Sequence, residues 1–303
     1  MNSKVLEIKN LQKKFGSFNA LTNISFDVYE GDVFGFLGPN GSGKSTTIRC
    51  ILSLIKQDGG LINIFGKKMQ ENRKEILSKI GCIIEKPDFY KYMSAKKNLE
   101  VFSRISGVNV SKNKIYEMLE FVGLSTREKD KVKGFSHGMK QRLGIAYTLL
   151  HDPDLIILDE PTTGLDPQGI VEIRNLIFRL NKEEKKTILL SSHQLSEIEL
   201  IANRMVIINK GEKIIEGNVS ELLNNDEILV EFNLDEVNSS TELLKKHYNN
   251  IVVKKTGKNL IEVMTTPQSI SKINNLFVKN DITVKSIIPK RKLEDYYMKI
   301  INQ

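Results

Sequence analysis

Short apolar runs along the first two-thirds of the chain predict strands. Residues 33–37, VFGFL, form a continuous apolar run that predicts a buried strand. Residues 155–158, LIIL, predict another, and four apolar residues in a row are typical of a strand buried on both faces of a parallel sheet. A third strand is predicted for residues 186–193, KTILLSSH.

Amphipathic stretches with helical spacing lie between these strands. After residue 45, one apolar stripe consists of Ile48, Ile51, Leu52 and Ile55. A second stripe follows residue 138 and consists of Met139, Leu143, Ala146, Tyr147 and Leu150. Both spacings predict a helix with one apolar face. The second helix is expected to end at His151-Asp152-Pro153, because proline cannot continue a helix.

The pattern changes beyond residue 222. Alternation at Ile228, Val230 and Phe232 predicts a strand. Helices are predicted at residues 239–248, at 267–280 and from Lys292. Strands are predicted at residues 251–255, 259–265 and 282–288. Strand, helix, hairpin, helix, strand is the ferredoxin-like order. We therefore predict two domains, residues 1–222 and a small α+β accessory domain at 223–303.

Composition narrows the class of protein. The chain has 303 residues with 40% hydrophobic and 27% charged, which is typical of a globular protein with a real core. No stretch approaches the roughly 18 apolar residues of a membrane span. The net charge of +8 suggests nucleic acid, but the acidic residues are interspersed and no basic run with aromatics occurs, so no nucleic-acid partner is expected.

The segment between the first strand and the first helix matches the P-loop pattern. Its residues are Gly38, Pro39, Asn40, Gly41, Ser42, Gly43, Lys44, Ser45 and Thr46. Glycines allow the backbone to wrap phosphates, and the helix directs free N–H groups at them. We expect Lys44 to reach the β- and γ-phosphates and the Ser45 hydroxyl to bind Mg²⁺. The segment therefore predicts a nucleotide site.

Two further strand ends carry candidate catalytic residues. The strand at 155–158 ends in Asp159 and Glu160. Beside a P-loop, Asp159 is placed to hold Mg²⁺ and Glu160 to polarise the attacking water. His193 ends the strand at 186–193, where it is placed to contact a γ-phosphate.

The combination of motifs resembles one family. The P-loop, FSHGMKQ, LIILDEP, TGLDP and a strand that ends in SSH occur in the order found in ABC-type ATPases, over about residues 4–217. The resemblance implies an α/β fold with a mostly parallel core sheet, an antiparallel β subdomain and a helical subdomain. It also implies ATP and Mg²⁺ as cofactors, and two ATPase subunits that meet head to tail.

The resemblance assigns roles to further residues. The signature segment, here residues 135–139, contacts the nucleotide of the partner subunit in that family, which implies that role for Ser136, His137, Gly138 and Met139. Asp166 in TGLDP is placed at the dimer seam. Phe15 in KKFGSFNAL resembles the aromatic residue that stacks on adenine.

The chain departs from the family pattern at two places. The signature usually reads Leu-Ser-Gly-Gly-Gln, and Phe135, His137 and Met139 replace its first, third and fifth residues. Glu85 stands where the family normally has a glutamine that touches Mg²⁺ or its water and couples the site to the membrane subunit. A carboxylate cannot donate a hydrogen bond as the amide does and adds negative charge, so slow ATP hydrolysis is expected.

The segment at 83–100, IIEKPDFYKYMSAKKNLE, together with FSHGMKQRLGIA, is similar to exporters that protect bacteria from bacitracin or lantibiotics. The ending RKLEDYYMKI resembles that of ABC-2-type exporters. We therefore expect the ATPase subunit of a peptide exporter, a homodimer at the cytoplasmic face of the plasma membrane, that works with a separate permease. Alternatives are an importer ATPase with a regulatory C-terminal domain, an ABC-2 exporter of another cargo, or an ATPase acting on ribosomes or DNA.

Overall fold

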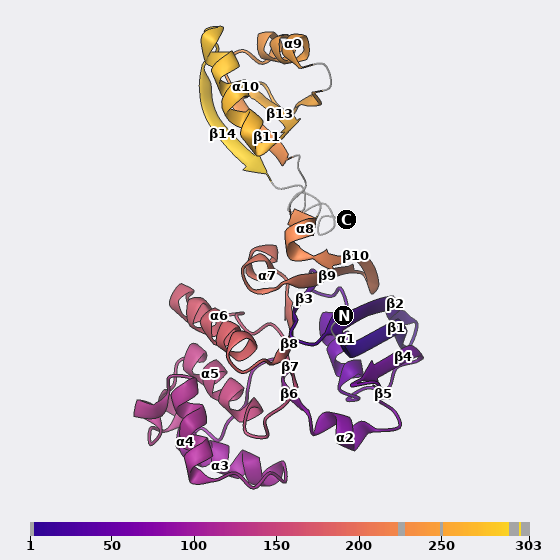
Figure 1. Cartoon of the computed structure of the whole chain (residues 1–303), viewed down its shortest axis with the longest axis vertical. Coiled ribbons are helices and arrows are strands. Elements are labelled where there is room, and N and C mark those ends of the chain that lie inside the picture. The colour runs from indigo at the N-terminus through magenta and orange to yellow at the C-terminus, as the bar shows by residue number, and fades with distance from the viewer. Residues whose placement is uncertain (1–2, 224–227, 249–250, 291–296, 298–303) are drawn as a thin grey trace. The chain divides into compact units, whose positions relative to one another are not determined.

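The chain divides into two compact units. The computed structural model describes residues 3–223, 228–248, 251–290 and 297. Unit 1 comprises residues 1–218 and unit 2 residues 219–303. The sequence prediction placed the boundary after residue 222, at the end of the short helix Val219–Leu223, whereas the contacts divide the chain just before that helix. Figure 1 shows the order of the elements in each unit.

A ten-stranded sheet forms the centre of unit 1. Its strand order is β5-β4-β1-β2-β10-β9-β3-β8-β7-β6. The half formed by β9, β3, β8, β7 and β6 is parallel throughout, as the apolar runs predicted. The strands of this half are β3 (Val33–Leu37), β6 (Ile80–Ile83), β7 (Leu155–Leu158), β8 (Thr187–Ser192) and β9 (Arg204–Asn209). All residues of β3, β7 and β8 are buried, which fits a strand covered on both faces.

The other half of the sheet is largely antiparallel and completes the predicted β subdomain. Its strands are β1 (Lys4–Phe15), β2 (Phe18–Tyr29), β4 (Gly59–Ile64), β5 (Lys67–Lys68) and β10 (Glu212–Asn218). β1 pairs with both β2 and β4 in antiparallel fashion. The Phe26 ring packs against the rings of Phe34 and Phe36, with centroids 5.3 and 5.2 Å away, and joins the two halves in one core.

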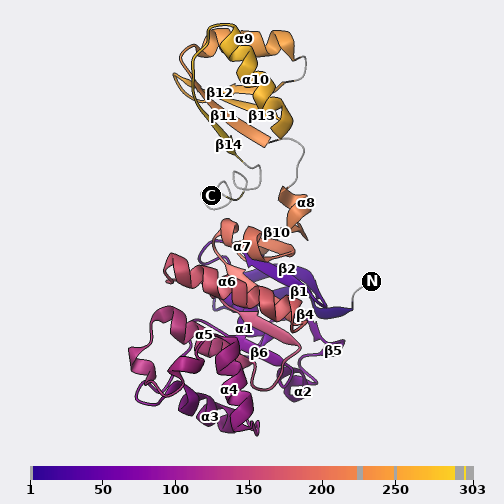
Figure 2. The same cartoon turned by 60° about the vertical axis from the view of Figure 1, so that its left-hand side comes forward.

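The helices of unit 1 lie around the parallel half of the sheet and beyond it, as Figures 1 and 2 show. They are α1 (Lys44–Ile51), α2 (Arg73–Leu77), α3 (Ala95–Ile105), α4 (Lys112–Phe121), α5 (His137–Thr148), α6 (Pro167–Lys182) and α7 (Leu195–Ile201). Two 3₁₀ turns, Ser125–Arg127 and Val132–Gly134, lie between α4 and α5. α3, α4 and α5 contact one another and form the helical subdomain. The α/β fold class with its three parts is confirmed.

A buried asparagine joins the loop after β6 to the helical subdomain. Asn98 on α3 is fully buried, accepts a hydrogen bond from the Tyr90 backbone N–H at 2.8 Å and donates to the carbonyl oxygens of Tyr90 and Ser94. Because an unpaired buried amide would destabilise the fold, these hydrogen bonds hold the backbone of residues 90–94 against α3.

Unit 2 is a four-stranded antiparallel sheet with the strand order β12-β13-β11-β14. After α8 (Val219–Leu223), its elements are β11 (Ile228–Leu234), α9 (Val237–His247), β12 (Val253–Lys255), β13 (Leu260–Thr265), α10 (Pro267–Lys279) and β14 (Val284–Lys290). From β11 on, this is the strand, helix, two strands, helix, strand order of a split βαβ unit. Phe232 on β11 and Phe277 on α10 meet edge to face at 5.5 Å in its core.

The last helix expected from Lys292 and most of the RKLEDYYMKI ending lie outside the described residues, although Tyr297 is described and buried. In the described parts of the chain, none of the helices has the length and apolar character needed to cross a bilayer.

Candidate functional site

The P-loop joins the end of β3 to the start of α1. Gly43 has a φ of 108°, which glycine adopts without strain, and precedes Lys44, the first residue of α1. A Cβ on Gly38 would lie 2.5 Å from both the Ile208 carbonyl oxygen and the Ser42 Oγ, so only glycine fits there. The buried Ser42 hydroxyl has no hydrogen-bond partner within the described residues. The loop therefore holds a tight turn with a spare donor, which suits an anion.

Lys44 lies against the loop rather than in solvent. Its Nζ donates to the carbonyl oxygens of Gly38 at 2.7 Å and Pro39 at 3.2 Å, and it lies 3.3 Å from Glu160 Oε1. Burial lowers the pKa of Lys44, while the Glu160 carboxylate favours the charged form. The buried ammonium faces the Glu160 carboxylate, an anion that a bound phosphate could replace.

The carboxyl ends of β7 and β8 bring the three predicted catalytic side chains together. β8 lies between β3 and β7, and all three strands run in the same direction, so their ends meet at the P-loop edge. His193 Nδ1 lies 3.0 Å from Glu160 Oε2, and the other carboxylate oxygen contacts Lys44. Sequence reasoning placed Glu160, His193 and Lys44 in one site, and the structure brings them into direct contact.

Glu160 is held in its position by the backbone and by hydrogen bonds. Its φ of 49° lies in the left-handed region, which a residue with a Cβ adopts at some cost. Its N–H donates to Ser191 Oγ at 2.9 Å, and its Oε2 accepts from Thr163 Oγ1 at 2.7 Å. Burial opposes ionisation, but the Thr163 hydroxyl and the Lys44 charge hold the pKa of Glu160 below its ordinary value. The side chain is therefore an ionised base at neutral pH.

Three hydroxyl residues and one carboxylate support this arrangement, and sequence reasoning missed all of them. The Ser191 hydroxyl donates to Asp159 Oδ1 at 2.5 Å, which orients the buried Asp159. Glu197 Oε2 on α7 accepts from both Thr162 Oγ1 at 2.7 Å and Ser192 Oγ at 2.8 Å. Glu197 thus connects the loop after β7 to the end of β8.

A cavity of about 270 Å³, the P-loop cavity, extends from this cluster to the β1–β2 hairpin. Its walls are formed by the P-loop, Glu160 and three residues of the hairpin: Phe15, Phe18, Ala20, Asn40, Gly41, Gly43, Lys44, Ser45, Thr46 and Glu160. One end is therefore polar and cationic and the other aromatic. This is the pattern expected of a nucleotide site, with Phe15 at the end predicted for the base.

A second cavity of about 220 Å³, the acidic cavity, adjoins the first at Ser45 and Glu160. Ser45, Glu85 and Asp159, the three predicted Mg²⁺ ligands, all line it. The described residues contain no group of three or more His, Cys, Asp or Glu side chains that would hold a metal on its own. Mg²⁺ takes one or two protein oxygens and completes its shell with phosphates and water, so a hydroxyl and a carboxylate here fit that ion.

Glu85 does not point freely into the acidic cavity. Its Oε1 accepts a hydrogen bond from Arg49 Nη2 on α1, and its side chain is 66% exposed. Its φ of 60° is also left-handed. The extra negative charge that the sequence places here is thus partly compensated by Arg49, a contact across 36 residues that spacing alone does not reveal.

The signature segment begins α5. The Ser136 hydroxyl is the helix N-cap and accepts from the Met139 N–H at 3.2 Å. His137 lines the acidic cavity of its own subunit together with Gln141, while Gly138 and Met139 lie in the first turn of the helix. Burial, Lys86 and Lys140 lower the pKa of His137, so it is neutral at pH 7.

Asp166 begins the neighbouring helix. It is the exposed N-cap of α6, and its Oδ1 accepts from the Gly169 N–H at 3.0 Å. The TGLDP turn therefore has a local structural role besides the predicted place at a dimer seam.

Comparison with known proteins supports the nucleotide site that this geometry indicates. A family model described as ABC transporter matches residues 21–163. The chain is 43% identical over 300 residues to the bacitracin transport ATP-binding protein BcrA of Bacillus licheniformis, over 99% of this chain and 98% of that protein. It is 44% identical over 212 residues to the lantibiotic transport ATP-binding protein SrtF of Streptococcus pyogenes, over 70% of this chain and 90% of that protein.

A solved structure extends the comparison. The dimeric post-hydrolysis state of an ATP-binding cassette bound to ADP and phosphate matches with a TM-score of 0.63 and 27% identity, over 71% of this chain and 98% of that one. The resemblance that the motifs indicated is confirmed. The chain belongs to the ABC transporter family, as an ATP-binding and ATP-hydrolysing subunit that works with membrane permease subunits.

Proposed function

We propose that the chain powers the export of antimicrobial peptides of the bacitracin or lantibiotic type from the cytoplasmic face of the plasma membrane. The observation that carries the proposal is the similarity to the bacitracin protein, which spans 98% of that relative and so includes unit 2. The lantibiotic relative supports the same cargo class over 70% of the chain. Residues 223–303 are proposed as an accessory domain of this transporter.

The contacts in unit 1 suggest how hydrolysis proceeds. Lys44 exchanges its contact with Glu160 for the β- and γ-phosphates, while the N–H groups at the start of α1 bind the same oxygens. The freed Glu160 carboxylate accepts a proton from the attacking water, and His193 holds the γ-phosphate beside it. Ser45 and Asp159 would hold Mg²⁺, which neutralises charge that develops on the phosphates.

A second copy of the chain completes the site in this proposal. Ser136, His137, Gly138 and Met139 begin a helix whose free N–H groups suit the γ-phosphate bound by the partner. Asp166 is the N-cap of α6, and Leu165 directly precedes it. A Cβ built on Gly138, in the first turn of α5, would lie 4.0 Å from the Leu165 side chain. The starts of α5 and α6 therefore lie side by side. Both therefore belong to one surface that is suited to a homodimer.

Glu85→Gln is expected to raise ATP turnover or to lower the Mg²⁺ concentration needed for half-maximal turnover. The change removes a negative charge from the wall of the acidic cavity and restores an amide that donates a hydrogen bond. Steady-state phosphate release across a Mg²⁺ series measures both quantities. The matched control is Glu120→Gln, an exposed carboxylate on α4. Identical rates and Mg²⁺ dependence in Glu85→Gln and wild type would contradict a role for Glu85 in the site.

Drug susceptibility tests the cargo. The chain and its neighbouring membrane subunit would be expressed in a sensitive host and challenged with bacitracin, several lantibiotics and unrelated toxins. Selective protection by wild type but not by Lys44→Ala is the expected result. No protection, with the complex intact in the membrane, would contradict the peptide cargo and favour another exporter cargo or an importer whose βαββαβ unit senses substrate.

A further inference from the structure

The aromatic end of the P-loop cavity has two rings, although the motif accounts for only one. Phe15 is the last residue of β1 and Phe18 the first of β2, and the two are register partners across the hairpin turn. Gly16 begins this turn with a φ of 59°. Side chains of directly opposed residues emerge on the same face of an antiparallel pair, and here both line the cavity. The second ring therefore faces the same space as the first.

Phe18 does not contribute to the core of unit 1. Its side chain is 64% exposed, against 50% for Phe15, whereas the next apolar residues of β2, Ala20 and Leu21, are buried. Single exposed aromatics are common, but two neighbouring ones that line a phosphate-binding cavity form an apolar wall that is half or more exposed. A planar apolar group of a ligand suits such a wall.

The surroundings of Phe15 determine where a base stacks. Lys13 Nζ lies over one face of the Phe15 ring, 5.4 Å from the centroid. Asp58 holds Lys13 there at 3.2 Å, and also accepts from the Lys14 N–H at 2.7 Å. One face of Phe15 is thus occupied by a fixed cation, so a base stacks on the other face. The base then extends along the hairpin beside Phe18.

We infer that Phe18 is a second base-contacting residue, which with Phe15 makes a two-ring platform for the base of a nucleoside triphosphate. Neither ring can form a directional hydrogen bond with a base, so the platform favours large aromatic bases over small ones without reading their edges. Purine triphosphates are therefore held more tightly than pyrimidine triphosphates. The inference rests on the assignment of the P-loop cavity to the nucleotide.

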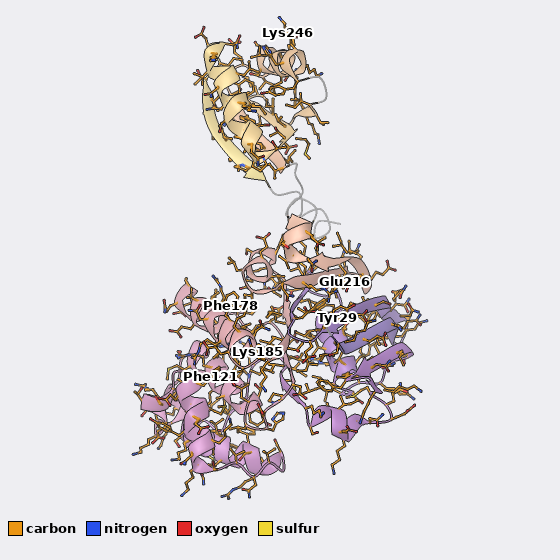
Figure 3. All side chains as sticks on the ribbon, viewed as in Figure 1. Tyr29, Phe121, Phe178, Lys185, Glu216 and Lys246 are labelled. Carbon is orange, nitrogen blue, oxygen red and sulfur yellow. The ribbon has the colours of Figure 1, made fainter. Side chains whose placement is uncertain are left out.

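Calorimetric titration of the full chain with ATP and with inorganic tripolyphosphate, both with Mg²⁺, tests the inference. Tripolyphosphate has the phosphates but no base. Phe18→Ala is expected to bind ATP about fivefold to a hundredfold more weakly, the range for loss of one base–aromatic stack, and tripolyphosphate as wild type does. The matched control is Phe178→Ala, a partly exposed phenylalanine on α6 that Figure 3 labels and that does not line the cavity.

Two further comparisons complete the test. Phe18→Tyr is expected to retain ATP affinity, and Phe18→Leu, which retains apolar bulk without a ring face, to lose most of it. Equal weakening of ATP and tripolyphosphate in Phe18→Ala, or no weakening of either, would overturn the inference. If the wild-type protein bound neither ATP nor tripolyphosphate, the assignment of the cavity to a nucleotide would itself fail. That result is distinct from the two Phe18→Ala outcomes that overturn the inference alone. Unfolding midpoints measured without ligand identify any variant that has lost its fold.

Discussion

Glu160→Gln is expected to lower ATP turnover by about a hundredfold to ten-thousandfold while nucleotide binding is retained, the range for loss of a general base. Glutamine keeps the size of the side chain and a carbonyl oxygen that can accept from Thr163, but it cannot take a proton from water. It also removes the negative charge that faces Lys44 at 3.3 Å. ATP affinity should therefore remain or increase.

In the proposed homodimer, ATP binding closes the two copies on each other and hydrolysis releases them, so the same variant should accumulate as an ATP-bound dimer. Phosphate release measures turnover, and size-exclusion chromatography with and without ATP measures the dimer. Glu120→Gln makes the same chemical change on an exposed face of α4 and should behave as wild type. If Glu160→Gln hydrolysed ATP at the wild-type rate, Glu160 would not be the general base.

Lys44→Ala is expected to weaken ATP binding by about tenfold to more than a hundredfold, the range for loss of hydrogen bonds to a charged group. The ammonium is buried and is the cation in direct contact with the P-loop carbonyl oxygens of Gly38 and Pro39. Its removal takes a positive charge away from the phosphates and leaves the backbone N–H groups at the start of α1 in place. Calorimetry with ATP measures the loss.

Lys112→Ala, at an exposed position in the first turn of α4, is the control for the loss of one positive charge. It should leave ATP affinity unchanged. Tripolyphosphate should lose as much affinity as ATP in Lys44→Ala, since both ligands share the phosphates. A Lys44→Ala protein with wild-type affinity for both ligands would contradict the contact between Lys44 and the phosphates.

The predicted site residues that the structure brings together are those whose position follows from a strand end. Continuous apolar runs identify β3, β7 and β8 as buried strands, and strands of a parallel sheet end at one edge. Lys44, Glu160 and His193 each follow such a run within a few residues. Their meeting therefore depends only on the order of motifs and the direction of the strands, both of which can be recognised in the sequence.

The contacts that the sequence did not predict depend on how separate elements pack. Arg49 reaches Glu85 only because α1 lies beside the loop after β6. His137 lines the acidic cavity of its own subunit because of how α5 packs on the sheet, which spacing does not determine. Phe18 looks like an ordinary strand residue until its register with Phe15 is known. Register and helix packing are tertiary properties, and no local pattern encodes them.

The position of Glu197 has a consequence for the timing of the catalytic cycle. One carboxylate oxygen on α7 holds the buried hydroxyls of Thr162 and Ser192, which lie two residues after Glu160 and one residue before His193. Neither the loop after β7 nor the end of β8 can shift far without breaking a bond to the same atom. We therefore expect base and histidine to withdraw from spent nucleotide, and to return, in a single concerted step with one relaxation rate.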